Sequence, residues 1–178
     1  MSNWNKIFKP IVVLVIICIV VTGALAATNG VTAPIIEEAK VAAENAARTE
    51  LLPEAEGAFT PVENVEVENV SAIYVADNRA GTIITSSAKG YGGDVVVMTA
   101  FNPDGTIKQI KVTEQAETKG IGSKVVDTPS YWENYQGLDA SQPLVLNEDV
   151  DAVTSATISS TALINAVNSA IEAYNAIP

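Results

Sequence analysis

The most constraining feature of this chain is an uncharged, apolar run near its N-terminus. The run extends from Ile11 to Ala27 in a chain of 178 residues, and as an α-helix it would be about 26 Å long at about 1.5 Å per residue. The hydrocarbon core of a bilayer is about 30 Å thick. Phe8 and a Lys9 side chain that extends to the interface can supply the missing length. We therefore predict one transmembrane helix over residues 10–28.

The basic residues beside this run predict its orientation. Lys6 and Lys9 are the only basic residues before Lys40, and cytoplasmic flanks carry the excess of positive charge. Residues 1–9 are therefore predicted to be cytoplasmic, and the rest of this single-pass protein to lie outside the cell membrane. A cleaved signal peptide is the alternative, because Ala24-Leu25-Ala26 resembles a cleavage site. The apolar run exceeds the usual length of a signal-peptide core, which favours an uncleaved anchor.

The composition disfavours several kinds of chemistry. Cys18 is the one cysteine and histidine is absent, so an intramolecular disulfide is excluded, and structural zinc, haem ligation and histidine catalysis are disfavoured. The net charge of −11 argues against binding to nucleic acid. We predict no metal site and no catalytic residue. The alternation of valine and glutamate over residues 65–68 could hold a cation, but it is more typical of a solvated edge strand.

Turn and periodicity signals predict the organisation of the remaining chain. Residues 29–66 are predicted to be a connecting helix and linker, in which Asn29-Gly30 breaks the membrane helix and a second helix ends at Pro53. Residues 67–178 form the predicted domain, with strands at 72–76, 81–85, 94–101 and 106–114. Asn102-Pro103-Asp104-Gly105 is a strong hairpin signal. The fold class is α+β, a twisted antiparallel sheet packed by a few helices.

A surface pair is predicted on the connecting helix. Glu44 and Arg48 have the i,i+4 spacing that places two side chains together on one face.

The last predicted helix, residues 160–176, creates a candidate anion site. Apolar residues recur along it at helical spacing, from Leu163 to Tyr174, and Ser159 or Ser160 is a good N-cap. Thr157 would then lie just before the helix, where unpaired N–H groups and the helix dipole favour a phosphate. Hydroxyl groups from Thr154 to Ser160 could add donors. The alternative is that these small residues only cap the helix and form a turn.

Three segments together resemble a known family. Asp151-Ala-Val-Thr-Ser-Ala-Thr157 resembles the flavinylation site of FMN-binding domains in the Rnf complex and the Na⁺-translocating NADH:quinone oxidoreductase. Lys89-Gly-Tyr-Gly-Gly-Asp94 looks like the family's glycine-rich start of the central hairpin. Glu117-Thr-Lys-Gly-Ile-Gly122 looks like its loop over the flavin, where Gly120 and Gly122 allow positive φ and close approach of backbone. With its short length, the chain is most similar to the G subunit of the Rnf electron transport complex.

The resemblance implies a cofactor and the residues that hold it. The phosphate of FMN would be esterified to Thr157, and Asp151 would be read by the attaching enzyme or would cap the turn. Ser155 stands where the family often has glycine, and Lys119 where proline is common; Lys119 could place a positive charge near the flavin. The other cofactor-binding residues are predicted to be Glu117, Thr118, Gly120, Ile121, Gly122, Thr154, Ser155, Ala156, Ile158 and Ser159.

The resemblance also implies a function. The chain would be an electron-relay subunit, not catalytic by itself, of a membrane ferredoxin:NAD oxidoreductase coupled to Na⁺ or H⁺ translocation. Its partners would be the other subunits and a flavin transferase that uses FAD and Mg²⁺. The alternatives are a membrane-anchored binding or scaffold module without cofactor, and a free-standing extracellular flavin electron carrier.

Overall fold

The computed structural model describes residues 8–63 and 65–177. Lys6 and most of the predicted cytoplasmic segment 1–9 lie outside these residues. The chain forms two units that divide after Ala43. The first consists mainly of helix, and the second contains the sheet.

The N-terminal helix α1 extends from Lys9 to Leu51 without interruption. The predicted break at Asn29-Gly30 is therefore wrong. A glycine inside a helix costs only about 1 kcal/mol relative to alanine, which the neighbouring turns can offset. The hydroxyl of Thr28 donates to the Ala24 carbonyl at 2.9 Å, and that of Thr32 to the Thr28 carbonyl at 3.0 Å.

Among the described residues, α1 is the one helix long and apolar enough to cross a membrane. Its large apolar side chains from Ile11 to Val31 are exposed. An exposed apolar surface of this extent fits contact with lipid. Helix α1 ends before Pro53, as predicted, and the short 3₁₀ helix η2 (Pro53–Ala55) follows.

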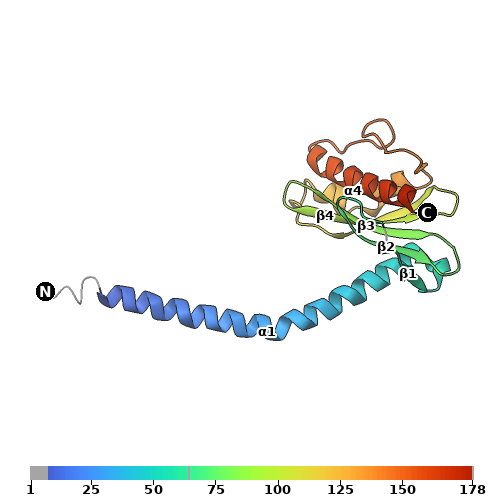
Figure 1. Cartoon of the computed structure of the whole chain (residues 1–178). Helices are drawn as coiled ribbons and strands as arrows, with labels where there is room; N and C mark the ends of the chain where they lie inside the picture. The colour runs from blue at the N-terminus through green and yellow to red at the C-terminus, as the bar shows by residue number, and fades with distance from the viewer. Residues whose placement is uncertain (1–7, 64, 178) are drawn as a thin grey trace. The chain divides into compact units, whose positions relative to one another are not determined.

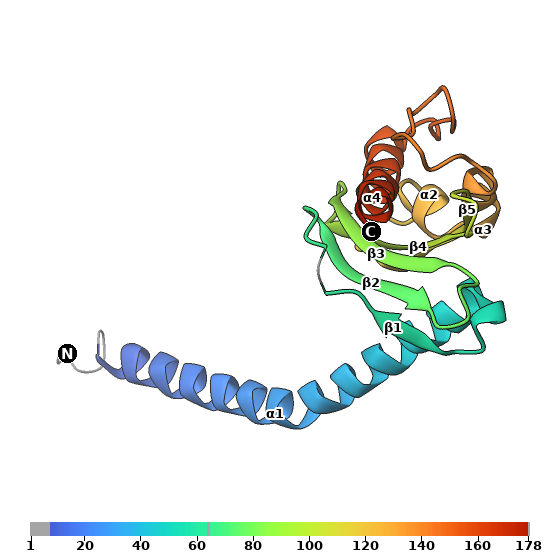
Figure 2. The same ribbon diagram turned by 45° about the vertical axis from the view of Figure 1, so that its right-hand side comes forward.

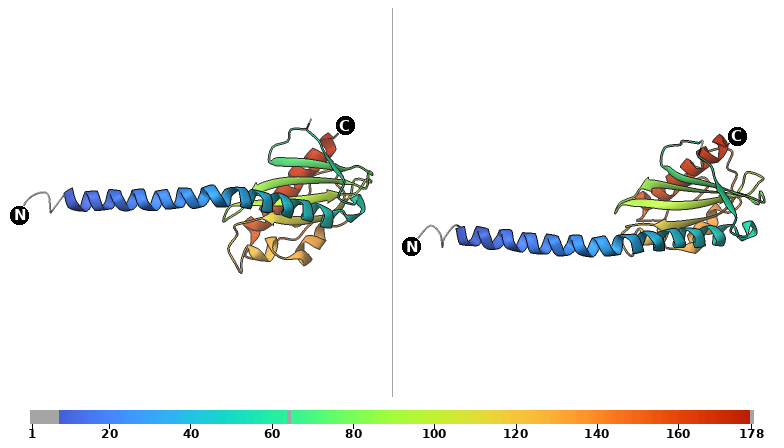
Figure 3. Two further views of the ribbon diagram at one scale, coloured as in Figure 1. Left: turned by 90° about the horizontal axis from the view of Figure 1, so that it is seen from below. Right: turned by 60° about the horizontal axis from the view of Figure 1, so that its bottom comes forward.

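The second unit is built on a five-stranded antiparallel sheet whose strands follow in chain order. They are β1 (Phe59–Pro61), β2 (Val70–Ala76), β3 (Thr82–Lys89), β4 (Asp94–Phe101) and β5 (Ile107–Glu114). The order can be followed by colour in Figure 3. The predicted strands and the hairpin at residues 102–105 are confirmed, and Gly105 has the positive φ, +85°, that this turn requires.

The predicted edge strand at residues 65–68 is wrong. Residues 65–67 are irregular, and a turn at residues 68 and 69 leads into β2. Asn69 has a φ of +64°, a conformation that asparagine tolerates better than most residues. Val65 and Val67 are half-buried against the core, which accounts for the alternation without a strand. No cluster of metal-ligating side chains occurs in the part of the chain that the structure describes.

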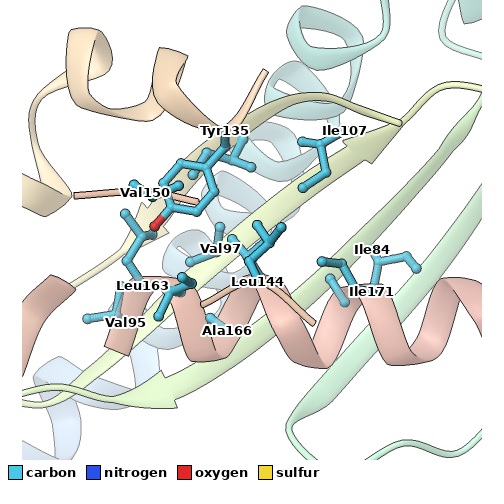
Figure 4. Packing of buried hydrophobic residues seen from close by; sticks show 14 of the residues in the cluster. Ile84, Val95, Val97, Ile107, Tyr135, Leu144, Val150, Leu163, Ala166 and Ile171 are labelled. Carbon is cyan, nitrogen blue, oxygen red and sulfur yellow. The ribbon is translucent and has the colours of Figure 1, made fainter. Parts of the chain in front are cut away.

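Helix α4 (Thr157–Ala176) covers one face of the sheet, with α2 (Ser123–Val126) and α3 (Pro129–Trp132) beside it (Figures 1 and 2). The 3₁₀ helix η3 (Glu133–Tyr135) follows α3. Figure 4 shows Leu163, Ala166 and Ile171 of α4 against the strands. These side chains are buried together with Val95 and Val97. The apolar periodicity predicted for this helix is thus its core face.

A smaller cluster covers the opposite face of the sheet. Ala47, Leu51 and Leu52 pack there with Ile83 and Met98. The alternation of β4 supplies both clusters, because successive side chains of a strand point to opposite faces.

The predicted surface pair between Glu44 and Arg48 is wrong. Arg48 is only 7% exposed; it donates to the Asn45 side chain and lies 3.9 Å from the centre of the Tyr74 ring. The apolar stem of an arginine packs well against such a surface, and the cation is attracted to the face of the aromatic ring.

Candidate functional site

The N-terminus of α4 begins at Thr157, three residues before the predicted start. Ala156 is the N-cap and makes no side-chain capping bond, so the prediction that Ser159 or Ser160 caps the helix is wrong. The first intrahelical bond joins the Ser160 amide to the Ala156 carbonyl at 2.9 Å. The amides of Thr157, Ile158 and Ser159 therefore precede the helical ladder, and the first turn contains no acidic residue. Such a terminus favours an anion.

The two serines of the first turn have other partners, which explains the shift. The Ser160 hydroxyl accepts a hydrogen bond from the Val153 amide at 3.1 Å, and the Ser159 hydroxyl donates to Glu117 at 2.6 Å. Both serines are buried.

The turn before α4 places Thr157 at the helix start. The Ala156 amide donates to the Val153 carbonyl at 2.9 Å, and Ser155 between them has a φ of +70°. This is the left-handed region, where a side chain costs roughly 1–2 kcal/mol. Ser155 thus holds a conformation that favours glycine. Thr154 is exposed in the same turn.

Asp151 lies at the start of this segment and is exposed. Its carbonyl accepts a hydrogen bond from the Tyr131 hydroxyl at 2.9 Å. The next amide, of Ala152, donates to the Asn147 side chain at 3.0 Å. The peptide group between Asp151 and Ala152 is therefore held by two hydrogen bonds, while Asp151 itself is exposed to solvent.

The loop from Glu117 to Gly122 lies against the same helix terminus. Gly120 has a φ of +83°, as the prediction of positive φ required, but Gly122 does not. Position 122 requires glycine for a different reason, because there is no space for a side chain. A Cβ atom on it would clash with the Glu117 carboxylate and lie 2.7 Å from the Ser159 Oγ. Lys119, in the same loop, is exposed and does not line the cavity described below.

Glu117 is the most buried charged group in this region, at 8% exposure. Its Oε1 accepts hydrogen bonds from the amides of Tyr91 at 2.8 Å and Gly92 at 3.1 Å, and its Oε2 from the Ser159 hydroxyl. Burial alone would raise the pKa of this carboxyl, but the three hydrogen bonds outweigh it and hold the pKa below its ordinary value. The group is ionised at neutral pH.

These segments enclose a cavity of about 480 Å³, within the range of about 300–1,000 Å³ that small-molecule sites occupy. Three apolar side chains on it are largely exposed: Tyr91 at 73%, Ile121 at 50% and Ile158 at 55%. Its lining consists of Tyr91, Glu117, Thr118, Ile121, Gly122, Ser155, Ala156, Thr157, Ile158 and Ser159.

The structure thus brings together most of the predicted site residues, from segments about 40 residues apart. Asp151, Thr154 and Gly120 do not line the cavity. Sequence reasoning missed Tyr91, although it lies inside the glycine-rich segment already singled out. An aromatic residue flanked by glycines in an exposed turn was the signal that could have found it. A larger hollow of about 810 Å³ includes Asn165, Asn168 and Asn175 of α4, and Lys89 is the one residue of the three motif segments that lines it.

Comparisons with known proteins identify the family of the chain. Residues 90–172 match the FMN-binding domain family, a range that contains all the residues lining the cavity. The G subunit of the Na⁺-translocating ferredoxin:NAD⁺ oxidoreductase complex of Acetobacterium woodii is 31% identical, over 97% of this chain and 93% of that protein. The chain belongs to the G-subunit family of ion-translocating oxidoreductase complexes.

Other members of the family resemble the chain over most of its length. The G subunit of the ion-translocating oxidoreductase complex of Methanosarcina acetivorans is 28% identical over 99% of this chain and 98% of its own. Among solved structures, Shewanella oneidensis NqrC aligns at 24% identity and a TM-score of 0.49, over 59% of this chain and 58% of that one.

The residues that line the cavity of this G subunit fit FMN. The free amides at the start of α4 suit a phosphate. The exposed apolar side chains of Tyr91, Ile121 and Ile158 suit a flat, largely apolar ring system. The one acidic group, Glu117, already accepts three hydrogen bonds within the protein, so it is not an open competitor for donors of the helix terminus.

Proposed function

We propose that this protein relays electrons within a membrane ferredoxin:NAD⁺ oxidoreductase coupled to Na⁺ or H⁺ translocation, through FMN bonded to Thr157. One observation carries the proposal: the threonine that ends the flavinylation motif is exposed at the first position of α4 and lines the cavity inside the region matched to FMN-binding domains. Bound FMN supplies reversible electron transfer. No acid or base from this chain is needed for that role.

The attachment is proposed to be a phosphoester on the Thr157 hydroxyl. In a flavin transferase that uses FAD, Thr157 Oγ1 attacks the phosphorus that carries the riboflavin. A new P–O bond forms, the pyrophosphate bond to AMP breaks, and AMP leaves with its electron pair. The hydroxyl proton passes to the transferase, and nothing is oxidised or reduced. The Mg²⁺ for this step belongs to the transferase.

The residues around Thr157 would hold the attached group. The amides at the start of α4 would stabilise the negative charge of the phosphodiester. Tyr91, Ile121 and Ile158 would contact the apolar part of the ring system. Thr118 and Gly122 also line the cavity, so their backbone would influence the polar edge of the flavin ring. These are binding roles, so the protein is not a catalyst by itself.

The proposed location rests on α1. We propose that α1 anchors the chain as a single transmembrane span, with residues 1–9 in the cytoplasm and the sheet domain outside, where the transferase and the other subunits meet it. The support is the exposed apolar surface of α1 and the two lysines that precede the span. The name of the A. woodii relative describes a subunit of an oxidoreductase complex. We therefore propose that the partners of this chain are the other subunits of such a complex.

Intact mass measurement tests the attachment. We would co-produce the full chain with a flavin transferase and expect a mass gain of one FMN less one water. The gain should be absent in Thr157→Ala and present in Thr161→Ala, which removes an exposed hydroxyl one helical turn further along α4. An unmodified wild-type mass would sink the proposal and favour a scaffold module without cofactor. A modified chain that never co-purifies with other redox subunits would instead identify a free-standing carrier.

A further inference from the structure

Glu117 joins three segments that are far apart in the sequence. Its own loop contributes the carboxylate, the β3–β4 turn contributes the amides of Tyr91 and Gly92, and the first turn of α4 contributes the Ser159 hydroxyl. The bonds bridge sequence separations of 26, 25 and 42 residues. We call this set of three bonds the Glu117 clasp.

The Glu117 side chain occupies the space in which side chains at the neighbouring glycine positions would lie. A Cβ atom on Gly90 would clash with Oε1 of Glu117, and one on Gly122 with Oε2. A Cβ on Gly92 would clash with the carbonyl of Ala116, next to Glu117. Atoms closer than van der Waals contact would have to shift the backbone or break the bonds. The β3–β4 turn and the loop of Glu117 thus carry glycine at the positions that contact this carboxylate or its neighbouring backbone.

The acceptor capacity of Glu117 is directed to the protein. Its two oxygens accept two amide hydrogens and one hydroxyl hydrogen at 2.6–3.1 Å, and hydrogen bonds to an ionised group are about twice as strong as neutral ones. The bonds hold Tyr91 by its amide while its side chain remains exposed on the cavity. They also hold Ser159, two residues after Thr157.

We infer that Glu117 is a positioning residue, which builds the flavin cavity by fixing Tyr91 and the start of α4 and does not itself contact FMN. The inference rests on the proposed function. It assigns to Tyr91, which the flavinylation motif does not include, a contact with the flavin ring. An aromatic ring in contact with a flavin quenches its fluorescence, since the ring donates an electron to the excited flavin. The clasp should therefore determine how strongly the attached flavin emits.

Hydrogen exchange of the full chain in detergent, without FMN, tests the clasp by itself. In Glu117→Ala the amides of Tyr91 and Gly92 should exchange about tenfold faster or more, since each loses a hydrogen bond to a charged acceptor. In Glu117→Gln the amide oxygen can still accept both bonds, but without the charge, so exchange should accelerate less than in Glu117→Ala. Equal exchange in wild type and Glu117→Ala would overturn the clasp. Equal acceleration in the Ala and Gln variants would also overturn it, because a retained oxygen acceptor at this position would then contribute nothing to the protection of the two amides.

Fluorescence of the flavinylated chains tests the consequence. We expect Glu117→Ala and Tyr91→Leu to lose the quenching seen in the wild type, and Glu117→Gln to keep it. Unchanged emission in Tyr91→Leu would overturn the contact between Tyr91 and the flavin. Intact mass separates the two proposals: an unmodified wild type refutes covalent FMN, while the exchange measurement still decides the clasp.

Discussion

Gly122 offers a sharp test of the site geometry, because two glycines of one loop are required for different reasons. In Gly122→Ala the added methyl group would clash with the Glu117 carboxylate and lie 2.7 Å from the Ser159 Oγ. In Gly120→Ala nothing lies within 4 Å of the added methyl group, and only the φ of +83° opposes it. The pair therefore separates a cost of crowding from a cost of backbone conformation.

The magnitudes follow from these contacts. Losing the bond from Ser159 to the charged carboxylate costs about 1.5–3 kcal/mol, and forcing an extra methyl group into a packed region costs about 1–3 kcal/mol. Because relief of the crowding breaks the same bond, the two costs overlap, and we expect Gly122→Ala to lose about 2–4 kcal/mol of unfolding free energy. Gly120→Ala should lose about 1–2 kcal/mol, the cost of a side chain in the left-handed region.

Chemical denaturation of the full chain in detergent, followed by tryptophan fluorescence, measures both values. Trp132 lies in the domain and donates to the Val125 carbonyl at 2.8 Å, so its emission should report unfolding near the site. Hydrogen exchange at Tyr91 should accelerate in Gly122→Ala and stay unchanged in Gly120→Ala. The reasoning would be refuted if Gly122→Ala were no more destabilising than Gly120→Ala, or if the Tyr91 amide responded equally to both.

Three further predictions concern the same domain. Ser155→Gly should raise the unfolding free energy by about 0.5–1 kcal/mol, since glycine adopts the φ of +70° without strain; thermal unfolding that gives the same midpoint as Ser155→Ala would contradict this. The folded-state pKa of Glu117 is held below its ordinary value of 4.5, so its stabilisation is fully present above that pH and is lost as the pH falls through the folded pKa. Denaturation at a series of pH values should show this loss in the wild type, and an equally steep acid limb in Glu117→Gln would count against it. Leu163→Ala, at a fully buried position of α4, should cost about 2–5 kcal/mol, whereas Thr161→Ala on the exposed side of the helix should change denaturation little.

Local signals in the sequence predicted the central part of the fold. The turn at residues 102–105 defined both flanking strands, because its residues carry the conformations of a hairpin. The spacing of apolar residues in α4 predicted its buried face, because residues that recur with the period of a helix lie on the same side of it. The prediction of a break at Asn29-Gly30 was wrong because the low helix propensity of glycine costs only about 1 kcal/mol. The helical turns on both sides of it in α1 offset this cost.

Long-range partners explain what sequence reasoning missed at the site. Serine is a residue type that favours the N-cap, but the Ser159 hydroxyl donates its hydrogen bond to Glu117, which lies 42 residues away in sequence. Arg48 has the spacing of a surface ion pair, but the face of Tyr74 covers it. Tyr91 lines the cavity only because the β3–β4 turn folds onto the loop at Glu117. Each of these contacts depends on the completed packing and leaves no periodic trace in the chain.

The three-way connection at Glu117 also bears on the order in which the domain can form. Antiparallel neighbours in chain order, β1 to β5, can pair as hairpins at small sequence separation, and such local contacts form early. The cavity cannot form through such local pairing, because the first turn of α4 lies more than 60 residues after the β3–β4 turn in the sequence. A growing chain therefore carries a paired sheet before it carries a binding site, and the site matures only when the helix has been synthesised and has docked.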